Sequence, residues 1–210
     1  ISSEGVVFER KGKEDTVSAE IVLVATGRMP NTEGLNLEAA GVEYSPKGIT
    51  TDDRMHTNVE GIYAIGDVNG RQMLAHAATM QGYMVVNEIL GKQSGICLDI
   101  MPAAIFTRPE AACVGVSEDF CKEKGMEYTC RKAFFRSNGK ALSMNETEGM
   151  LKIIADNNGK IIGCHCFGPH SADIVQEISV LMCRETTISQ LADMVHIHPT
   201  LGEIIHDAAM

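Results

Sequence analysis

The stretch Leu151-Lys152-Ile153-Ile154-Ala155-Asp156-Asn157-Asn158-Gly159-Lys160-Ile161-Ile162-Gly163-Cys164-His165-Cys166-Phe167 decides how the second half of this chain folds. Two apolar runs, residues 151–155 and 160–167, flank the turn sequence Asp156-Asn157-Asn158-Gly159. Asparagine and glycine tolerate the backbone conformations of tight turns, so these four residues fix the register of a β-hairpin. The hairpin predicts an antiparallel sheet in this region.

Strands and helices are expected on both sides of this hairpin. Residues 104–106 and 112–116 are short strand candidates, and Ser117 caps a helix that ends at Gly125. Thr187 to Gln190 fits a capping box that opens a short helix. A helical stripe follows the hairpin, formed by Ile174, Val175, Ile178, Leu181 and Met182. Residues 99–210 are therefore predicted to form an α+β unit with an antiparallel sheet.

The first half of the chain has a different pattern, in which strands alternate with helices. Residues 6–8 alternate apolar and polar side chains, Lys11-Gly12-Lys13 supplies a turn, and residues 19–25 form an apolar run that ends at Thr26-Gly27. We interpret this as a hairpin whose second strand, residues 19–25, is buried on both faces. A short helical piece is expected at residues 35–40, closed by Gly41, and a strand near residues 49–51.

A second strand-to-helix connection follows. Ile62-Tyr63-Ala64-Ile65 reads as a strand that runs into Gly66-Asp67, and residues 73–90 place apolar side chains on one helical face before Gly91 stops the helix. Gln93-Ser94-Gly95 marks the boundary. Residues 1–98 are predicted to be an α/β unit, followed by the α+β unit 99–210.

Composition bounds the class of protein. Of the 210 residues, 44% are hydrophobic and 22% charged, as in ordinary globular proteins, and the net charge of −10 disfavours nucleic acid as a partner. The sequence has neither an apolar run long enough for a membrane span nor the pattern of a signal peptide. We expect a cytoplasmic protein, or an organellar matrix protein after processing. The chain begins at Ile1 rather than methionine, so we expect it to be part of a longer protein.

The seven cysteines indicate reduced thiols, because their number is odd and no Cys-x-x-Cys occurs. On a strand, alternation places Cys164 and Cys166 on one face. Two interpretations stay open: buried structural thiols, or a soft-metal site that also includes His165. The first is the more common fate of a free cysteine.

Asp67 follows a predicted strand and a glycine, at the end of a sheet where open α/β folds bind ligands. Its carboxylate could accept hydrogen bonds from the hydroxyls of a sugar or ribityl chain, or it could merely make a turn. The helix that begins near Met73 adds free N–H groups and a positive dipole. His76 on its first turn reads, by itself, as a surface residue. Gly27 gives a flat ligand close access to the backbone.

The stretch His196-Ile197-His198-Pro199-Thr200-Leu201-Gly202-Glu203 carries the strongest candidate for acid/base chemistry. Glu203 could form a Thr200-x-x-Glu203 capping box at the start of a helix over residues 204–209. It could instead hold one nitrogen of His198, fixing the tautomer and raising the basicity of the ring. Pattern alone gives no such role to His196 or His206, which we expect to face solvent.

Several strings, taken together in this order, resemble the carboxy-terminal part of the flavoprotein pyridine nucleotide-disulfide oxidoreductases. The strings are Ala25-Thr26-Gly27-Arg28-x-Pro30-Asn31, Ile62-Tyr63-Ala64-Ile65-Gly66-Asp67, Met73-Leu74-Ala75-His76, Thr107-Arg108-Pro109-Glu110, Val114-Gly115 and His196-x-His198-Pro199-Thr200-Leu201-x-Glu203. Met-Leu-Ala-His and Thr-Leu-x-Glu resemble the dihydrolipoamide dehydrogenase branch more than the glutathione or mercuric reductases. The resemblance covers essentially the whole chain, from about Gly5 onward.

The resemblance implies a role for each matching residue. Gly27 would lie near NAD, Asp67 would hold the ribityl chain of FAD, and Met73, Leu74, Ala75 and His76 would present a helix end to the flavin. His198, held by Glu203, would be the acid/base for a dithiol, acting on the redox disulfide of the partner subunit in a homodimer. Residues 1–98 would be incomplete carboxy-terminal pieces, an α/β remnant, of the NAD- and FAD-binding domains, and residues 99–210 would be the dimerisation (interface) domain. The implied partner is a small dithiol or a lipoamide-bearing protein of a 2-oxo acid dehydrogenase or glycine cleavage complex.

Three departures limit the resemblance. The redox Cys-x4-Cys and both Gly-x-Gly-x-x-Gly fingerprints are missing from this chain, and Ala77 stands where the family commonly has lysine. The leading hypothesis is a part of a FAD- and NAD-dependent dihydrolipoamide dehydrogenase that supplies the base and the dimer interface. The alternatives are another disulfide reductase of the family, or a dimerisation module that is inactive by itself.

Overall fold

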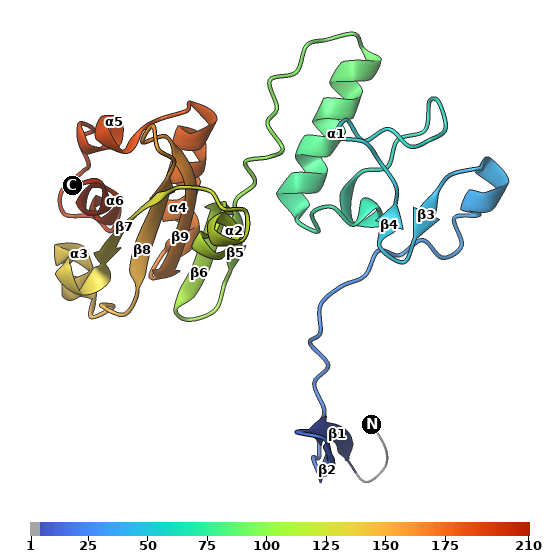
Figure 1. The fold of residues 1–210 in the computed structure, drawn as a ribbon, viewed down its shortest axis with the longest axis horizontal. Coiled ribbons are helices and arrows are strands. Elements are labelled where there is room, and N and C mark those ends of the chain that lie inside the picture. The colour runs from blue at the N-terminus through green and yellow to red at the C-terminus, as the bar shows by residue number, and fades with distance from the viewer. Residues whose placement is uncertain (1–4) are drawn as a thin grey trace.

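The computed structural model describes residues 5–210, so the first four residues of the predicted unit 1–98 lie outside it. The described residues form two folded regions, connected by residues 91–102, which contain neither helix nor strand (Figure 1). Within these residues, no helix combines the length and apolarity that a membrane crossing requires.

The carboxy-terminal region is built on a five-stranded antiparallel sheet, as predicted. Its strands are β5 (Ala103–Ile105), β6 (Glu110–Gly115), β7 (Thr129–Phe134), β8 (Met150–Ala155) and β9 (Ile161–Gly168), in the spatial order β5-β6-β9-β8-β7. The β8–β9 hairpin lies near the centre, in a register that pairs Leu151 with Cys166 and Ile153 with Cys164.

The predicted turn explains that register. Asp156 Oδ1 accepts the backbone N–H groups of Asn158 and Lys160, each at 2.9 Å, and Gly159 takes a φ of 77°. The turn therefore satisfies its own polar groups while glycine adopts the left-handed conformation at no steric cost.

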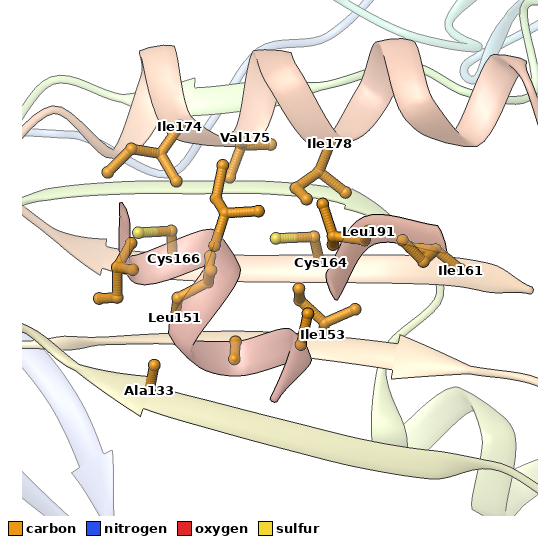
Figure 2. Close-up of a cluster of buried hydrophobic side chains, with 14 of the residues drawn as sticks. Ala133, Leu151, Ile153, Ile161, Cys164, Cys166, Ile174, Val175, Ile178 and Leu191 are labelled. Carbon is orange, nitrogen blue, oxygen red and sulfur yellow. The ribbon is translucent and has the colours of Figure 1, made fainter. Parts of the chain in front are cut away.

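One face of the sheet is covered by α4 (Ser171–Cys183) and α6 (Glu203–Ala209), with the short helix α5 (Ile188–Ala192) beside them. Figure 2 shows the α4 side chains Ile174, Val175 and Ile178 over the apolar face of the strands. Burial of each such side chain contributes about 1.5–3 kcal/mol. The predicted stripe and the predicted Thr187 capping box are both confirmed, since Thr187 and Gln190 cap each other reciprocally.

The other face carries α2 (Glu118–Glu123), capped by Ser117 as predicted. Glu118 of this helix pairs with Lys152 at 2.7 Å, and Lys152 alternates with the buried Leu151 and Ile153 on β8. A 3₁₀ turn (Phe135–Ser137) and α3 (Gly139–Met144) connect β7 to β8.

The amino-terminal region contains smaller pieces. They are the hairpin of β1 (Val6–Arg10) and β2 (Lys13–Val17), a 3₁₀ turn (Leu37–Ala40), the pair β3 (Tyr44–Ser45) and β4 (Gly48–Ile49), a 3₁₀ turn (Gly66–Asn69) and α1 (Ala75–Ile89). The helix stops before Gly91, and the first 3₁₀ turn ends at Gly41, both as predicted. The hairpin stands apart, at the end of an extended stretch (Figure 1).

The prediction of a buried strand at residues 19–25 is wrong. The hairpin closes earlier, on β2, and residues 19–25 form no strand. Ile21 is 87% exposed and Leu23 86%. A strand needs neighbouring backbone to pair with its N–H and C=O groups, and no described residue supplies a ladder to this run.

The predicted strand before Asp67 is also wrong, because Ile62–Ile65 does not form a ladder. Tyr63 makes only an isolated bridge to His56, and the chain then enters the Gly66–Asn69 3₁₀ turn. Ala64 is nevertheless buried, packed with Val42 and Ile49 in a small core.

Candidate active site

His198 lies on the turn between α5 and α6, with its side chain 77% exposed. The His198–Pro199 peptide bond is cis. After the proline, Thr200 Oγ1 donates to the Ile197 carbonyl at 2.7 Å, and the Thr200 carbonyl accepts from Asn138 Nδ2 at 3.1 Å. These contacts fix the backbone beneath an imidazole that remains accessible.

Glu203 holds this turn with both of its carboxylate oxygens. Oε1 lies 2.8 Å from His198 Nδ1, and Oε2 accepts the Thr200 N–H at 2.8 Å. The two interpretations of Glu203 are therefore compatible. The capping box itself is only half formed, since the Thr200 hydroxyl does not cap α6 and Gly202 is the N-cap residue.

The same contacts lower the pKa of Glu203. The principal cause is the hydrogen bond from the Thr200 N–H, and the hydrogen bond from His198 adds to it. A carboxylate that stays ionised makes Nδ1 of the neutral ring the protonated nitrogen, which leaves Nε2 free to accept a proton. No described residue hydrogen-bonds to that Nε2. The arrangement is that of an oriented general base.

The prediction that His196 and His206 face solvent is wrong. The His196 side chain is 9% exposed, its Nδ1 donates to the Met194 carbonyl at 3.2 Å, and its Nε2 lies 3.1 Å from Glu177 Oε1 on α4. The His206 ring lies 5.9 Å from the His196 ring, centroid to centroid, and its Nδ1 is buried. Sequence reasoning missed Glu177 because it lies 19 residues before its partner.

Asn138 was missed as well. It is 2% exposed, caps α3 by accepting the Ala141 N–H at 3.0 Å, and donates to Thr200. An asparagine directly before a helix is a cap signal, so the capping role of Asn138 could have been predicted from the sequence. Its hydrogen bond to Thr200 could not, because the two residues are 62 positions apart.

In the other region, the structure brings Asp67 and the start of α1 together. Gly66, at a φ of 72°, donates its N–H to Gln81 Oε1 of α1 at 2.7 Å, and a Cβ at Gly66 would come within 3.2 Å of the Ala78 Cβ. Asp67 next to it is exposed, and no described residue hydrogen-bonds to its carboxylate.

The four residues Met73, Leu74, Ala75 and His76 form the entry to α1. Leu74 is the N-cap residue, and no side chain caps the first turn, so its N–H groups are open to a ligand. His76 Nε2 lies 2.8 Å from the Pro102 carbonyl, a contact that connects α1 to the start of the sheet region. The residues expected near FAD thus lie close together, but the His198–Glu203 pair makes no hydrogen bond to them among residues 5–210.

Gly27 is exposed at a φ of 102°, and a Cβ placed there would meet no atom within 4 Å. Its backbone is open, as a close approach by a flat ligand requires. No described contact joins it to the other candidate residues.

Two family descriptions match this chain. The description of the pyridine nucleotide-disulphide oxidoreductase dimerisation domain matches residues 101–209, and that of the pyridine nucleotide-disulphide oxidoreductases matches residues 1–82. The chain belongs to the pyridine nucleotide-disulphide oxidoreductase family. The resemblance of the sequence strings is thereby confirmed, and the cofactors of this family are FAD and NAD.

Among the relatives of this oxidoreductase chain, dihydrolipoyl dehydrogenase of Bacillus subtilis is 42% identical over 97% of the chain, which spans 44% of that relative. A mitochondrial dihydrolipoyl dehydrogenase of Pisum sativum is 39% identical over 95% of the chain and 40% of the relative. The crystal structure of LpdA from Mycobacterium tuberculosis superposes with a TM-score of 0.86 at 31% identity, covering 99% of this chain and 46% of LpdA. The chain thus spans less than half the length of these relatives.

Cys164 and Cys166 are buried thiols of the sheet core. Cys164 is fully buried and Cys166 is 3% exposed, both on the core side of β9. Burial raises the pKa of Cys166 to about 11 and that of Cys164 well above its usual range. His165 points to the opposite face and lies 3.0 Å from the Val116 carbonyl, so it cannot join them around a metal. Within residues 5–210, no three histidine, cysteine, aspartate or glutamate side chains are grouped so that they could hold a metal ion.

Proposed function

We propose that this chain supplies the acid/base half of the active site of a dihydrolipoamide dehydrogenase, which converts dihydrolipoamide and NAD⁺ to lipoamide and NADH. The observation that carries the proposal is the double contact of Glu203, which orients His198 and holds the turn below it. The names of the relatives support the choice of substrate.

His198 would take a proton from the dithiol at Nε2, because Nδ1 is engaged with Glu203. The thiolate formed in this way is the nucleophile that attacks one sulfur of a disulfide. The S–S bond breaks, and the base then gives its proton to the leaving thiolate. Glu203 stabilises the imidazolium that forms during the transfer. The missing Cys-x4-Cys means that the disulfide belongs to residues outside this chain.

We propose that the sheet region, residues 99–210, pairs with a second copy and places His198 at the partner's disulfide. The match to a dimerisation domain supports this. So does the exposure of two apolar side chains just before the base, with Val195 98% and Ile197 78% exposed. Large apolar side chains beside a functional residue are typical of a surface that another chain covers.

The residues of the amino-terminal region, residues 1–98, fit the cofactors of the family. Asp67 offers ribityl hydroxyls a carboxylate that no described residue pairs with. The start of α1 at Leu74 to His76, which no described side chain caps, offers N–H groups to the flavin. Gly27 offers open backbone to NAD. When bound, FAD and NAD accept the electrons of the dithiol in succession.

The proposed partner is a lipoamide-bearing protein of a 2-oxo acid dehydrogenase or glycine cleavage complex, or a small dithiol, in the cytoplasm or an organellar matrix. The experiment that tests the base is His198→Gln in the full-length enzyme. We expect dithiol-dependent NAD⁺ reduction to fall by about 10²- to 10⁴-fold, the typical contribution of one positioned base. Activity near that of the wild type would overturn the assignment.

The second candidate is a dimerisation module without activity of its own. The observation that favours it is the lack of both glycine fingerprints and the cysteine pair from this chain. The 210-residue chain, purified alone, should then be dimeric and colourless. A flavin absorbance band at stoichiometric level would contradict this candidate and would show that the residues around Asp67 bind FAD unaided.

A further inference from the structure

A second imidazole–carboxylate pair supports the turn that carries His198. His196 Nε2 lies 3.1 Å from Glu177 Oε1, and the His196 side chain is nine-tenths buried. Glu177 is on α4, one of the two helices that cover the sheet. The turn is therefore tied to the helix layer two residues before the base.

His196 also meets the other helix of that layer. Its ring packs against His206 of α6 at 5.9 Å between centroids and at an angle of 50°. Its Nδ1 donates to the Met194 carbonyl, which closes the start of the turn. His196 is thus the point at which α4, α6 and the turn meet.

The turn is also held by hydrogen bonds after His198, at the backbone of Thr200. Asn138 holds the Thr200 carbonyl, and Glu203 holds the Thr200 N–H. Between these anchors, the His198 ring hydrogen-bonds to Glu203, its one hydrogen-bond partner among residues 5–210. Loss of either anchor would let the ring move relative to that carboxylate.

We infer that Glu177 and His196 are positioning residues for His198, acting through the backbone of the turn and not by contact with substrate. Their role in catalysis rests on the proposed function, whereas their effect on the geometry of His198 does not. An experiment can therefore contradict the proposed function without contradicting this inference, and the reverse.

The test is imidazole nitrogen NMR of the 210-residue chain, at a pH well above the usual range of histidine titration. In the wild type, the His198 signals should report a ring protonated at Nδ1. In Glu177→Gln, the His198 signals should move toward the values of a mixture of the two tautomers. In Glu177→Asp, they should lie between those of the wild type and those of Glu177→Gln. The matched control is Glu185→Gln, which removes a glutamate from an exposed pair with Lys160 in the same region.

The inference fails if Glu177→Gln shifts the His196 signals but leaves those of His198 in place, in a variant whose amide spectrum shows it folded. Glu177 is half exposed, so this variant leaves the core intact. In the full-length enzyme, Glu177→Gln should lower kcat for dithiol oxidation on the order of 10-fold, below the ~10²-fold cost of a 1 Å misplacement. The KM for NAD⁺ and the reduction of an artificial electron acceptor by NADH should not change.

Discussion

Apolar side chains are extensively buried in the sheet region, whereas many of them are exposed in the amino-terminal region. In the sheet region, Leu151 and Ile153 are fully buried beneath α4 and α6, and every strand pairs within the region. In the amino-terminal region, the buried cluster comprises only Val42, Ile49 and Ala64, with a few further buried side chains such as Met55 and Ala77 outside it, while a neighbouring apolar run is left exposed. The sheet region completes its own fold, whereas the sequence pattern of residues 19–25 calls for partners that the described residues do not provide.

The same difference separates the two groups of candidate residues. His198 has an orienting carboxylate and an anchored turn within its own region, so its geometry is set locally. Asp67 and Gly27 are exposed, with no hydrogen bond to their functional groups from any described residue. We therefore expect the base to be preformed and the cofactor residues to gain their environment only from groups outside the chain.

Proteolysis should give the largest difference between the regions. Trypsin should cut at Arg28, in the exposed stretch without secondary structure, far faster than at Arg131, which is paired with Ile153 in the sheet. If opening of the sheet costs ~4 kcal/mol, the ratio of rates is on the order of 10³. Mass spectrometry of early fragments measures it, and similar rates at the two sites would remove the distinction between the regions.

Truncation of one leucine in each region should destabilise the fold to very different extents. Leu151→Ala leaves a cavity under α4 and should lower the free energy of unfolding by about 2–5 kcal/mol. Leu23→Ala, at a side chain that is 86% exposed, should change it by less than about 0.5 kcal/mol. Denaturant titration, followed by circular dichroism, gives the free energy of unfolding of each variant. An equal decrease in both variants would mean that residues 19–25 are buried.

Thiol reactivity should follow burial in the same way. Cys97 and Cys183 are exposed, whereas Cys166 is buried with a pKa of about 11. At pH 8 a thiol with that pKa is thiolate in only about one molecule in 10³. Alkylation of Cys166 should therefore be at least ~100-fold slower than alkylation of Cys97 or Cys183. Timed alkylation followed by peptide mapping tests this. Rapid labelling of Cys166 in the folded chain would argue against a closed sheet core.

The smallest expected effect is a pH dependence confined to the amino-terminal region. His56 lies 2.8 Å from Asp52 through Nδ1 and 2.8 Å from Glu88 of α1 through Nε2, and the hydrogen bond to Asp52 is the chief cause of its raised pKa. A raised pKa in the folded state means that the contribution to stability is complete below the ordinary pKa of histidine. It is lost as the pH rises through the raised value.

Hydrogen exchange of the α1 amides, corrected for the intrinsic effect of pH, should therefore show protection that weakens as the pH rises through the raised pKa of His56, while β8 and β9 show no such trend. His56→Gln should abolish the trend. A trend that persists in this variant would assign it to other groups.

The sequence predicted local structure wherever the determining residues are neighbours. The Asp156–Gly159 turn, the Thr187 capping box and the Ser117 cap all satisfy their polar groups within a few residues, and all three are confirmed. The predicted strand at residues 19–25 failed because a strand depends on backbone from elsewhere, which no local pattern reveals.

The candidate site shows the same limit. Glu203 could be assigned from sequence because it lies five residues from His198, although only the structure shows that it serves both partners at once. The burial of His196 depends on Glu177 in a helix that the sequence places far away, and so it was mispredicted. Packing of α4 and α6 on the sheet, not the turn sequence, decides which histidine is exposed.

We propose that this chain supplies a base to a disulfide on another subunit, a claim that hybrid dimers of the full-length enzyme can test. His198→Gln protomers and protomers whose redox cysteines are replaced should each be inactive as homodimers. After mixing and exchange, random two-fold pairing should restore about a quarter of wild-type dithiol oxidation, because each hybrid assembles one complete site from its two chains. No recovery in a mixture shown to contain hybrids would contradict the claim, since it would place His198 and the disulfide on the same chain.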